Sequence, residues 1–170
     1  MRPFVDALAG TRIGRTFNQY ADSELRRARL VDYLECRRDA RFVLVGEAAG
    51  YRGARVSGIP FTSERQLTGA GPAEATATIV HRTLAELGIA EDVLLWNVVP
   101  THAGTAGTNR RPTGAEVRDG MPFLLEILRG RTPIAVGRVA HAVLGGRYVR
   151  HPSHGGTAEF RAGLLLSIRR

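Results

Sequence analysis

The chain has 170 residues, with 24 basic and 16 acidic side chains and a net charge of +8, and its length suits one domain, residues 1–170, with a substantial core. One cysteine, Cys36, excludes an internal disulfide and a cysteine-ligated structural metal, and no apolar run is long enough to cross a bilayer. Every basic residue is arginine, which excludes Schiff-base chemistry by lysine and suits either a polyanionic partner or, more simply, a soluble surface.

The first half of the chain predicts a helix, a buried strand, a long loop and a second helix. Apolar residues in the range 16–39 recur at helical spacing and predict an amphipathic helix with a solvated arginine face. The run Phe42–Val45 is apolar and rich in β-branched residues, which is typical of a buried parallel strand. Residues 46–71 exceed an ordinary connection, so we expect a functional or disordered loop. Pro72 suits the first turn of the next helix, which Gly88 ends.

The second half of the chain continues the alternation of strands and helices. Residues 113–116 have the spacing of a capping box, so a helix starts there, and Pro122 predicts that this helix kinks or restarts. The other predicted elements are strands at 93–99, 134–136 and 147–150, a polar loop at 100–112, and helices at 139–144 and around 160–168. The fold class that follows is a three-layer α/β/α sandwich with a central, mostly parallel four-stranded sheet.

Polar side chains stand where three of the predicted strands end: Glu47, Asn97 and His151. Because ligands of open α/β sheets bind at the carboxyl ends of the strands, we expect the three side chains to converge on one cleft. Each also has an ordinary explanation, since Glu47 could cap a turn, Asn97 could bond its own backbone and His151 could be a satisfied histidine. We favour one shared site over three unrelated explanations.

Four motifs, in this order, resemble the uracil-DNA glycosylase superfamily. Gly46-Glu47-Ala48-Ala49-Gly50, followed by Gly-Ile-Pro-Phe at 58–61, is similar to the G-E-A-P-G … G-x-P-F motif of its iron–sulfur branch, family 4. Residues 96–99 and 109–116 resemble that branch's N-V-V and N-R-x-P-T-x-x-E segments, and residues 151–153 match the H-P-S motif of the superfamily. The resemblance runs from about residue 42 to residue 160. It implies the fold predicted above and a DNA-repair glycosylase.

The chain departs from the iron–sulfur branch at the cluster ligands. That branch uses four cysteines, whereas Thr101 and Gly120 stand at two of the corresponding positions here, and Cys36 is the one cysteine near the other pair. A four-thiolate cluster is therefore excluded, and we expect a relative that uses no metal or cofactor. Turn chemistry and packing would then hold residues 100–112 in shape.

Two side chains, Asn97 and Phe61, are expected to recognise the base. The Asn97 amide can accept from N3–H of uracil and donate to O4, a pairing that cytosine would break, and the ring of Phe61 would stack on the base. The small residues Gly46, Ala48 and Gly50 would let the backbone approach the base. In a better-known branch, with the motif G-Q-D-P-Y, a tyrosine at the position of Gly50 blocks the methyl group of thymine. Here Tyr51 or the loop 52–57 fills that space, or the pocket accepts other damaged bases.

Bond cleavage is assigned to Glu47 and His151. The resemblance places His151 beside O2 of uracil, where it would donate to the charge that develops on the leaving base. Glu47 would position the attacking water or support the cationic sugar, although the water-activating aspartate of G-Q-D-P-Y lies one position later, where this chain has Ala48. His102 and Glu64 are reserve candidates for that role. The absence of lysine predicts a monofunctional enzyme that leaves an abasic site without cutting the strand.

DNA contacts are expected from the loop before the last helix and from exposed arginines. The loop offers backbone N–H groups and a hydroxyl to a phosphate, and His154 is a candidate for the wedge that fills the space of the flipped base. Each arginine could equally be an ordinary solvated side chain. The predicted DNA contacts are Ser153, His154, Gly155, Arg52, Arg55, Arg110 and Arg111.

The leading hypothesis is thus a monomeric, cytoplasmic DNA-repair enzyme that hydrolyses the N-glycosidic bond of uracil in single- or double-stranded DNA. Three alternatives remain at this point. A relative could prefer hypoxanthine or mispaired thymine, or a non-catalytic protein could use the same pocket to bind damaged DNA. A Rossmann-like nucleotide enzyme is the weakest, because residues 46–50 lack G-x-G-x-x-G and a long loop follows in place of a helix.

Overall fold

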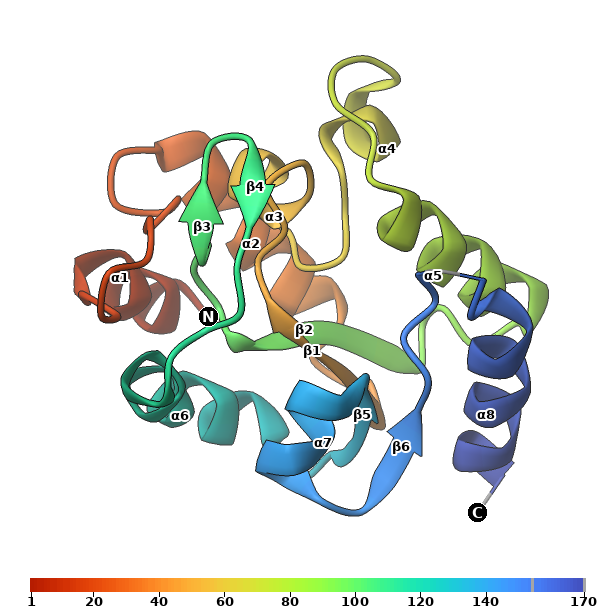
Figure 1. The fold of residues 1–170 in the computed structure, drawn as a ribbon. Coiled ribbons are helices and arrows are strands. Elements are labelled where there is room, and N and C mark those ends of the chain that lie inside the picture. Colours follow the sequence, from red (N-terminus) through yellow and green to blue (C-terminus); the bar gives the residue numbers. More distant parts are fainter. Residues whose placement is uncertain (154, 170) are drawn as a thin grey trace.

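Four parallel strands form the central sheet of the computed structural model, which describes residues 1–153 and 155–169 (Figure 1). The strands are β1 (Phe42–Ala48), β2 (Val93–Val99), β5 (Thr132–Val136) and β6 (Arg147–Val149), in the spatial order β2-β1-β5-β6. Every neighbouring pair is parallel, so all four strands end at the same edge. The predicted α/β fold with a four-stranded parallel sheet is confirmed.

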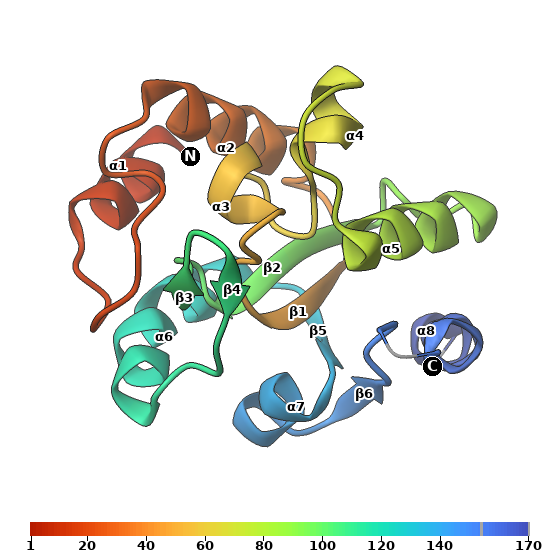
Figure 2. The same ribbon diagram turned by 45° about the horizontal axis from the view of Figure 1, so that its top comes forward.

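Helices cover both faces of the sheet, as the alternation of apolar residues along β1 requires. Val43 and Val45 pack with α1 (Arg2–Gly10), α2 (Glu24–Cys36), α6 (Gly114–Leu128) and α7 (Arg138–Leu144). Phe42 and Leu44 pack on the opposite face with α5 (Ala75–Glu86) and α8 (Thr157–Arg169). Figure 2 shows α5 and α8 on one side of the sheet and α1 and α6 on the other.

The helix predicted over residues 16–39 is shorter at both ends, running from Glu24 to Cys36 as α2. Ser23 caps it, because the serine side chain accepts a hydrogen bond from the Arg26 N–H. The preceding residues form an irregular segment in which Phe17 and His102 exchange backbone hydrogen bonds. Helix α1 lies before that segment and was not predicted.

Helix α6 runs unbroken across Pro122, so the predicted restart of the helix does not occur. The capping box predicted over residues 113–116 is present at its start. Beyond the proline, Leu124 and Ile127 stay buried against the sheet. A proline inside a helix costs about 3 kcal/mol, and burying each large aliphatic side chain contributes about 1.5–3 kcal/mol. Packing therefore outweighs the local preference of the sequence.

Two segments predicted as long loops contain short elements of their own. The segment after β1 carries α3 (Ala54–Ser57) and α4 (Glu64–Thr68), and the segment after β2 carries a hairpin of β3 (Gly104–Thr105) and β4 (Thr108–Asn109). Both segments rise above the carboxyl ends of the strands (Figure 1). Among the described helices, none has the length and apolar character needed to span a membrane.

Candidate active site

A cleft of about 400 Å³ opens at the carboxyl edge of the sheet. The end of β1, from Gly46 to Gly50, lines it together with Asn97 of β2 and His151, which follows β6. Phe61 reaches the same cleft from the segment between α3 and α4. The structure therefore brings together the three groups at the strand ends and the aromatic ring, which lie far apart along the chain.

Gly46 allows the ring of Phe61 and the amide of Asn97 to meet above the end of β1. Gly46 lies opposite Asn97 in the β1–β2 register. A Cβ atom at Gly46 would lie 2.9 Å from Asn97 Oδ1 and would collide with the Phe61 ring, so only glycine fits there. Asn97 is 3% exposed, and within the described residues its side-chain amide has no hydrogen-bond partner. Its donor and acceptor are thus available in the cleft.

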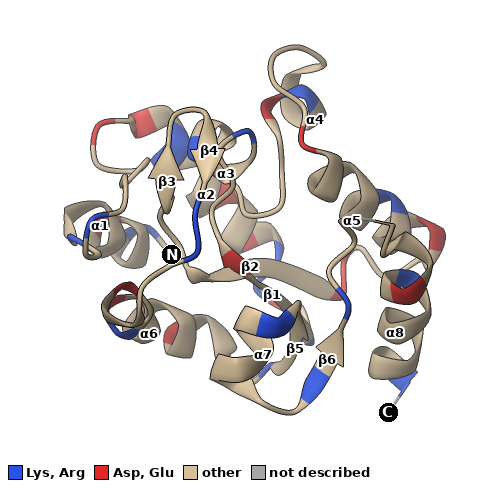
Figure 3. Ribbon diagram, viewed as in Figure 1, with Lys and Arg blue, Asp and Glu red and all other residues tan. Residues whose placement is uncertain are grey.

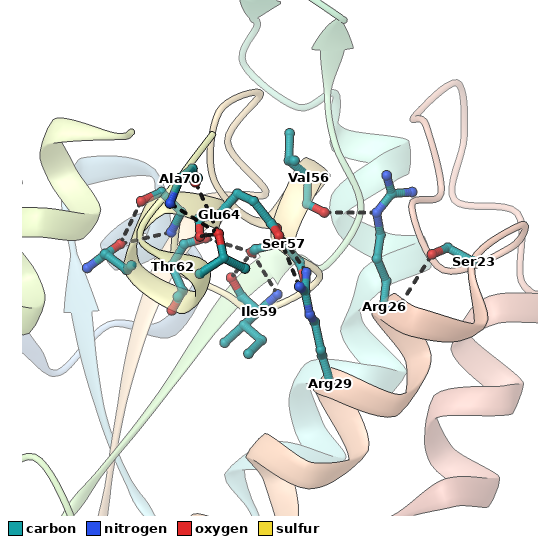
Figure 4. A network of polar contacts seen from close by, with 12 residues as sticks. Ser23, Arg26, Arg29, Val56, Ser57, Ile59, Thr62, Glu64 and Ala70 are labelled. Atoms are coloured by element: carbon teal, nitrogen blue, oxygen red, sulfur yellow. Dashed lines mark hydrogen bonds and ion pairs between the residues drawn. The ribbon is translucent and has the colours of Figure 1, made fainter. Parts of the chain in front are cut away.

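Helix α2 holds the segment that carries Phe61. Arg29 forms a bidentate pair with Glu64, with Nη1–Oε2 and Nη2–Oε1 distances of 2.8 and 2.9 Å. Arg26 donates to the carbonyl of Val56 at 2.9 Å, and Figure 4 shows both arginines reaching from α2 to this segment. Because Arg29 occupies the Glu64 carboxylate and Glu64 does not line the cleft, the structure offers no support for Glu64 as a water activator.

The backbone of Phe61 adopts a conformation that side chains seldom accept. Among the described residues it is the one non-glycine with a positive φ, at 52°. Such a conformation costs about 1–3 kcal/mol and persists where the surroundings impose it. Ser57 imposes it here, because its hydroxyl donates to the Thr62 carbonyl at 2.6 Å and accepts from the Ile59 N–H at 3.1 Å. The strain is stored where the ring is placed over the cleft.

The imidazole of His151 is oriented by a neighbour two residues along the chain. The backbone N–H of Ser153 donates to Nδ1 at 3.2 Å, and Ser153 Oγ lies 2.7 Å from the same nitrogen. A backbone N–H can only donate, so Nδ1 is an acceptor and the proton of the neutral ring is assigned to Nε2. His151 lines the cleft as a hydrogen-bond donor.

Glu47, the second-last residue of β1, brings a carboxyl group to the cleft. Burial raises the pKa of this carboxyl above its usual value, and the positive charge of Arg111 partly opposes that rise. Figure 3 shows the acidic end of β1 facing the basic stretch that leads from β4 to α6. A carboxylate with a raised pKa in a cleft is suited to accepting a proton near neutral pH.

The β3–β4 hairpin is tied to the end of β1 by His102 and Asn109. His102 is fully buried, with Nδ1 2.7 Å from the Ala49 carbonyl and Nε2 2.7 Å from the Thr105 carbonyl. Asn109 Oδ1 accepts from the Tyr51 N–H at 2.9 Å. His102 therefore supports the wall of the cleft, and because both of its ring nitrogens face carbonyl oxygens, neither is available to act as the reserve catalytic base.

Arg110 was predicted to contact phosphate, but its guanidinium is engaged within the protein. It pairs with Glu116 through Nη1–Oε2 and Nη2–Oε1 distances of 2.8 and 2.6 Å. Glu116 also accepts from the N–H groups of Arg15 and Thr113, and these contacts, with Arg110 the strongest, lower its pKa to about 2. Arg110 lines the cleft, but its guanidinium serves mainly to hold Glu116 and the residues bound to it.

The remaining predicted site residues divide between the cleft and its surroundings. Ala48, Arg111 and Ser153 line the cleft. Tyr51, Arg52, Arg55 and Gly155 are not among the lining residues: the Arg52 guanidinium lies 5.2 Å from the Tyr51 ring centroid, that of Arg55 lies 4.8 Å from the Phe17 ring centroid, and Gly155 is exposed. His154, the predicted wedge, lies outside the described residues.

Five lining residues were not among the predicted site residues: Ala49, Glu74, Thr76, Ala103 and Asn109. Of these, Glu74 and Thr76 come from an element that the sequence analysis did not connect with the site. Both residues stand at the start of α5, where the sequence, through Pro72, predicted the beginning of a helix and no functional residue. An acidic residue near a helix N-terminus is common for electrostatic reasons alone. No local pattern therefore marked Glu74 as part of the site.

The positions of the iron–sulfur cysteines have other functions here. Thr101 is buried and its hydroxyl lies 2.6 Å from the Thr16 hydroxyl. Gly120 lets α6 approach β2 closely, since a Cβ there would lie 2.6 Å from the Val98 carbonyl oxygen. These positions do not fit a cluster. Across the described part of the chain, no group of three or more His, Cys, Asp or Glu side chains could hold a metal ion.

Comparison with known proteins identifies one family and one fold. The sequence model of the uracil DNA glycosylase superfamily matches residues 34–166. Among solved structures, that of wild-type SMUG2 from Pedobacter heparinus matches with a TM-score of 0.68 and 16% sequence identity, covering 98% of this chain and 95% of that chain. At this identity the likeness is one of fold. A search of curated protein sequences found no match.

Proposed function

The chain belongs to the uracil DNA glycosylase superfamily, and we propose that its own reaction is the removal of uracil from DNA by hydrolysis of the N-glycosidic bond. The observation that carries the proposal is the shared cleft, which Phe61, Asn97, Glu47 and His151 all line. Glycosylases turn the target nucleotide out of the stack into a fitted pocket. Phe61 suits the face of the base, Asn97 suits its hydrogen-bonding edge, and Glu47 and His151 suit the chemistry of bond cleavage.

The uracil ring would stack on Phe61 while its polar edge forms hydrogen bonds with Asn97. The amide accepts from N3–H and donates to O4, and cytosine would leave both amide groups facing the wrong partner in a buried site. Sites of this kind discriminate by about 10⁴–10⁵. Stacking on Phe61 contributes about 1–3 kcal/mol to binding and does not depend on the identity of the base.

Cleavage would proceed by departure of uracil as an anion. The bond between C1′ and N1 breaks with its electron pair on the base, and Nε2–H of His151 donates to O2, where part of the negative charge gathers. Water adds to the oxocarbenium-like C1′, and Glu47 accepts the proton that the water loses. The products are uracil and an abasic site. Since the chain has no lysine, no side-chain amine can continue to strand cleavage.

Arg111 is the arginine best suited to a DNA phosphate. It is exposed, lines the cleft, and has no ion-pair partner within the described residues. Ser153 also lines the cleft and is suited to the same purpose.

The proposal is tested with oligonucleotides that carry uracil, hypoxanthine or a G·T mismatch at one position. Strand breaks that depend on uracil and appear only after alkali treatment support it. Breaks at hypoxanthine or mispaired thymine alone would assign another substrate, and tight binding without breaks would indicate a damage-binding protein.

Asn97→Asp tests the reading of the base. A carboxylate can accept from the exocyclic amine of cytosine, so we expect the preference for uracil over cytosine, about 10⁴ or more for such a site, to fall by at least an order of magnitude. Excision of both bases is compared in single-turnover assays, with circular dichroism as the check on folding. A folded variant that keeps full discrimination would remove Asn97 from base recognition.

A further inference from the structure

Glu74 lies in the cleft wall in a position that no motif explains. It precedes α5 in the chain, and its carboxylate lies directly against the backbone of Gly50 and Gly53. A Cβ atom built on either glycine would collide with the carboxylate oxygens of Glu74. The side chain of Glu74 thus occupies the space that a side chain at position 50 or 53 would take.

Among the described residues, the carboxylate of Glu74 has no partner that would account for its position. It makes no capping bond at the start of α5, and no hydrogen bond or ion pair of its oxygens is found in residues 1–153 or 155–169. Burial raises its pKa, as expected for a carboxyl that has lost water without gaining a cation. A group kept in the cleft wall at this cost is suited to contact a ligand.

In the proposed binding mode, one edge of the pyrimidine has no partner assigned and is available to contact Glu74. With the ring on Phe61, N3 and O4 are taken by Asn97, O2 by His151, and N1 carries the sugar. The remaining edge is C5–C6, which adjoins O4 on the side away from O2. Helix α5 connects β1 to β2, the strand of Asn97, whereas α8 packs beside β6, which leads to His151 (Figure 2). The start of α5 therefore lies toward the Asn97 end of the cleft.

We propose that Glu74 closes the cleft against the C5 edge of the base and so excludes pyrimidines with a substituent at C5, such as thymine. The inference rests on the proposed function, and it names the residue that decides between uracil and its 5-substituted forms. The wall on this side of the cleft is then supplied by an element other than β1, and the absence of side chains at Gly50 and Gly53 leaves room for the carboxylate in its present position.

Truncation of Glu74 tests the inference through a ratio of activities. For Glu74→Ala we expect kcat/KM on thymine opposite guanine, relative to uracil opposite guanine, to rise about tenfold or more, the effect of making room for one methyl group. Glu74→Gln keeps the size of the side chain and should keep the exclusion. Glu86→Ala, at the other end of α5 and outside the cleft, is the matched control.

A second measurement tests the geometry without relying on turnover. Gly50→Ala should lower the thermal unfolding temperature because its Cβ meets Glu74, and it should do so much less in the Glu74→Ala background. Removal of the clash in the double variant supports the inference, and equal losses in both backgrounds would overturn it.

The two failures are distinguishable. If the wild-type chain excises uracil and the thymine ratio of Glu74→Ala stays at the wild-type value, the inference alone is wrong. If the wild-type chain excises no uracil, the proposed function falls and the inference with it.

Discussion

The two sides of the cleft are held in place by different means. Phe61 depends on a network that spans two layers of the fold, in which Arg26 and Arg29 of α2 hold the segment between β1 and α5. His151 is oriented by Ser153, two residues away. The platform can therefore be disturbed from a distance, whereas the described hydrogen bonds that orient the imidazole are local. The two sides also act at different stages, since stacking on Phe61 is present before and during the reaction and the polar groups matter most as charge develops.

Among single substitutions in and around the cleft, Glu47→Gln should produce the largest loss of catalytic rate. A general base contributes about 10²–10⁴ in rate, and we expect kcat to fall by this amount. Because burial raises the pKa of Glu47 and the ionised form accepts the proton, wild-type activity should fall as the pH drops through that raised pKa, above pH 4.5. The pH profile of kcat/KM in Glu47→Gln should lose this acid limb. A variant that keeps the limb would move the titrating group elsewhere.

His151→Ala should come next. Loss of one donor to a developing anion costs about 10²–10³ in rate, while affinity for DNA should change little because the donor acts on charge that is absent in the bound substrate. Single-turnover rates and binding isotherms measure the two effects separately. His141→Ala, an exposed histidine of α7, is the control. Equal losses of rate and affinity would take His151 out of catalysis.

Phe61→Leu should weaken the platform and leave the polar side intact. Stacking is worth about 1–3 kcal/mol, so affinity for uracil-containing DNA should fall about 5- to 150-fold, and kcat at saturating substrate should fall much less. Phe61→Tyr keeps the ring and should stay near the wild type. The account of the platform would be wrong if leucine bound DNA as tightly as phenylalanine.

Arg29→Met should give the smallest effect and is the sharpest test of anchoring from a distance. Without Arg29 the segment around Phe61 loses its bidentate tie, so KM should rise by less than the Phe61→Leu effect, within about tenfold, with kcat nearly unchanged. Arg41→Met removes a more exposed pair with Asp92, far from Phe61, and should leave KM unchanged. If both variants behave alike, the Arg29 pair contributes only to general stability.

The sequence was most informative where local pattern and fold logic agree. The apolar runs that stop at Glu47 and Asn97 predicted two parallel strands, and the rule that the carboxyl ends of such strands lie at one edge was enough to bring both groups and His151 to a common cleft. The capping box at 113–116 could also be predicted from the sequence, because capping is a local interaction.

What the sequence did not reveal depends on contacts between distant elements. Helix α1 has only nine residues, too few for a helix to be stable by itself, and packing of Phe4, Val5 and Leu8 in the core stabilises it. The positive φ of Phe61 is imposed by Ser57 and the α2 arginines, which no propensity at residue 61 records. Glu74 reaches the cleft from the start of a helix, and Pro122 is carried through α6 by burial.

The most direct test of the account is a crystal structure of the protein with uracil bound. We predict that the ring lies on Phe61, with N3 and O4 within hydrogen-bond distance of the Asn97 amide and O2 beside Nε2 of His151. Uracil bound outside this cleft, or inside it with Asn97 and His151 both out of contact, would contradict the account.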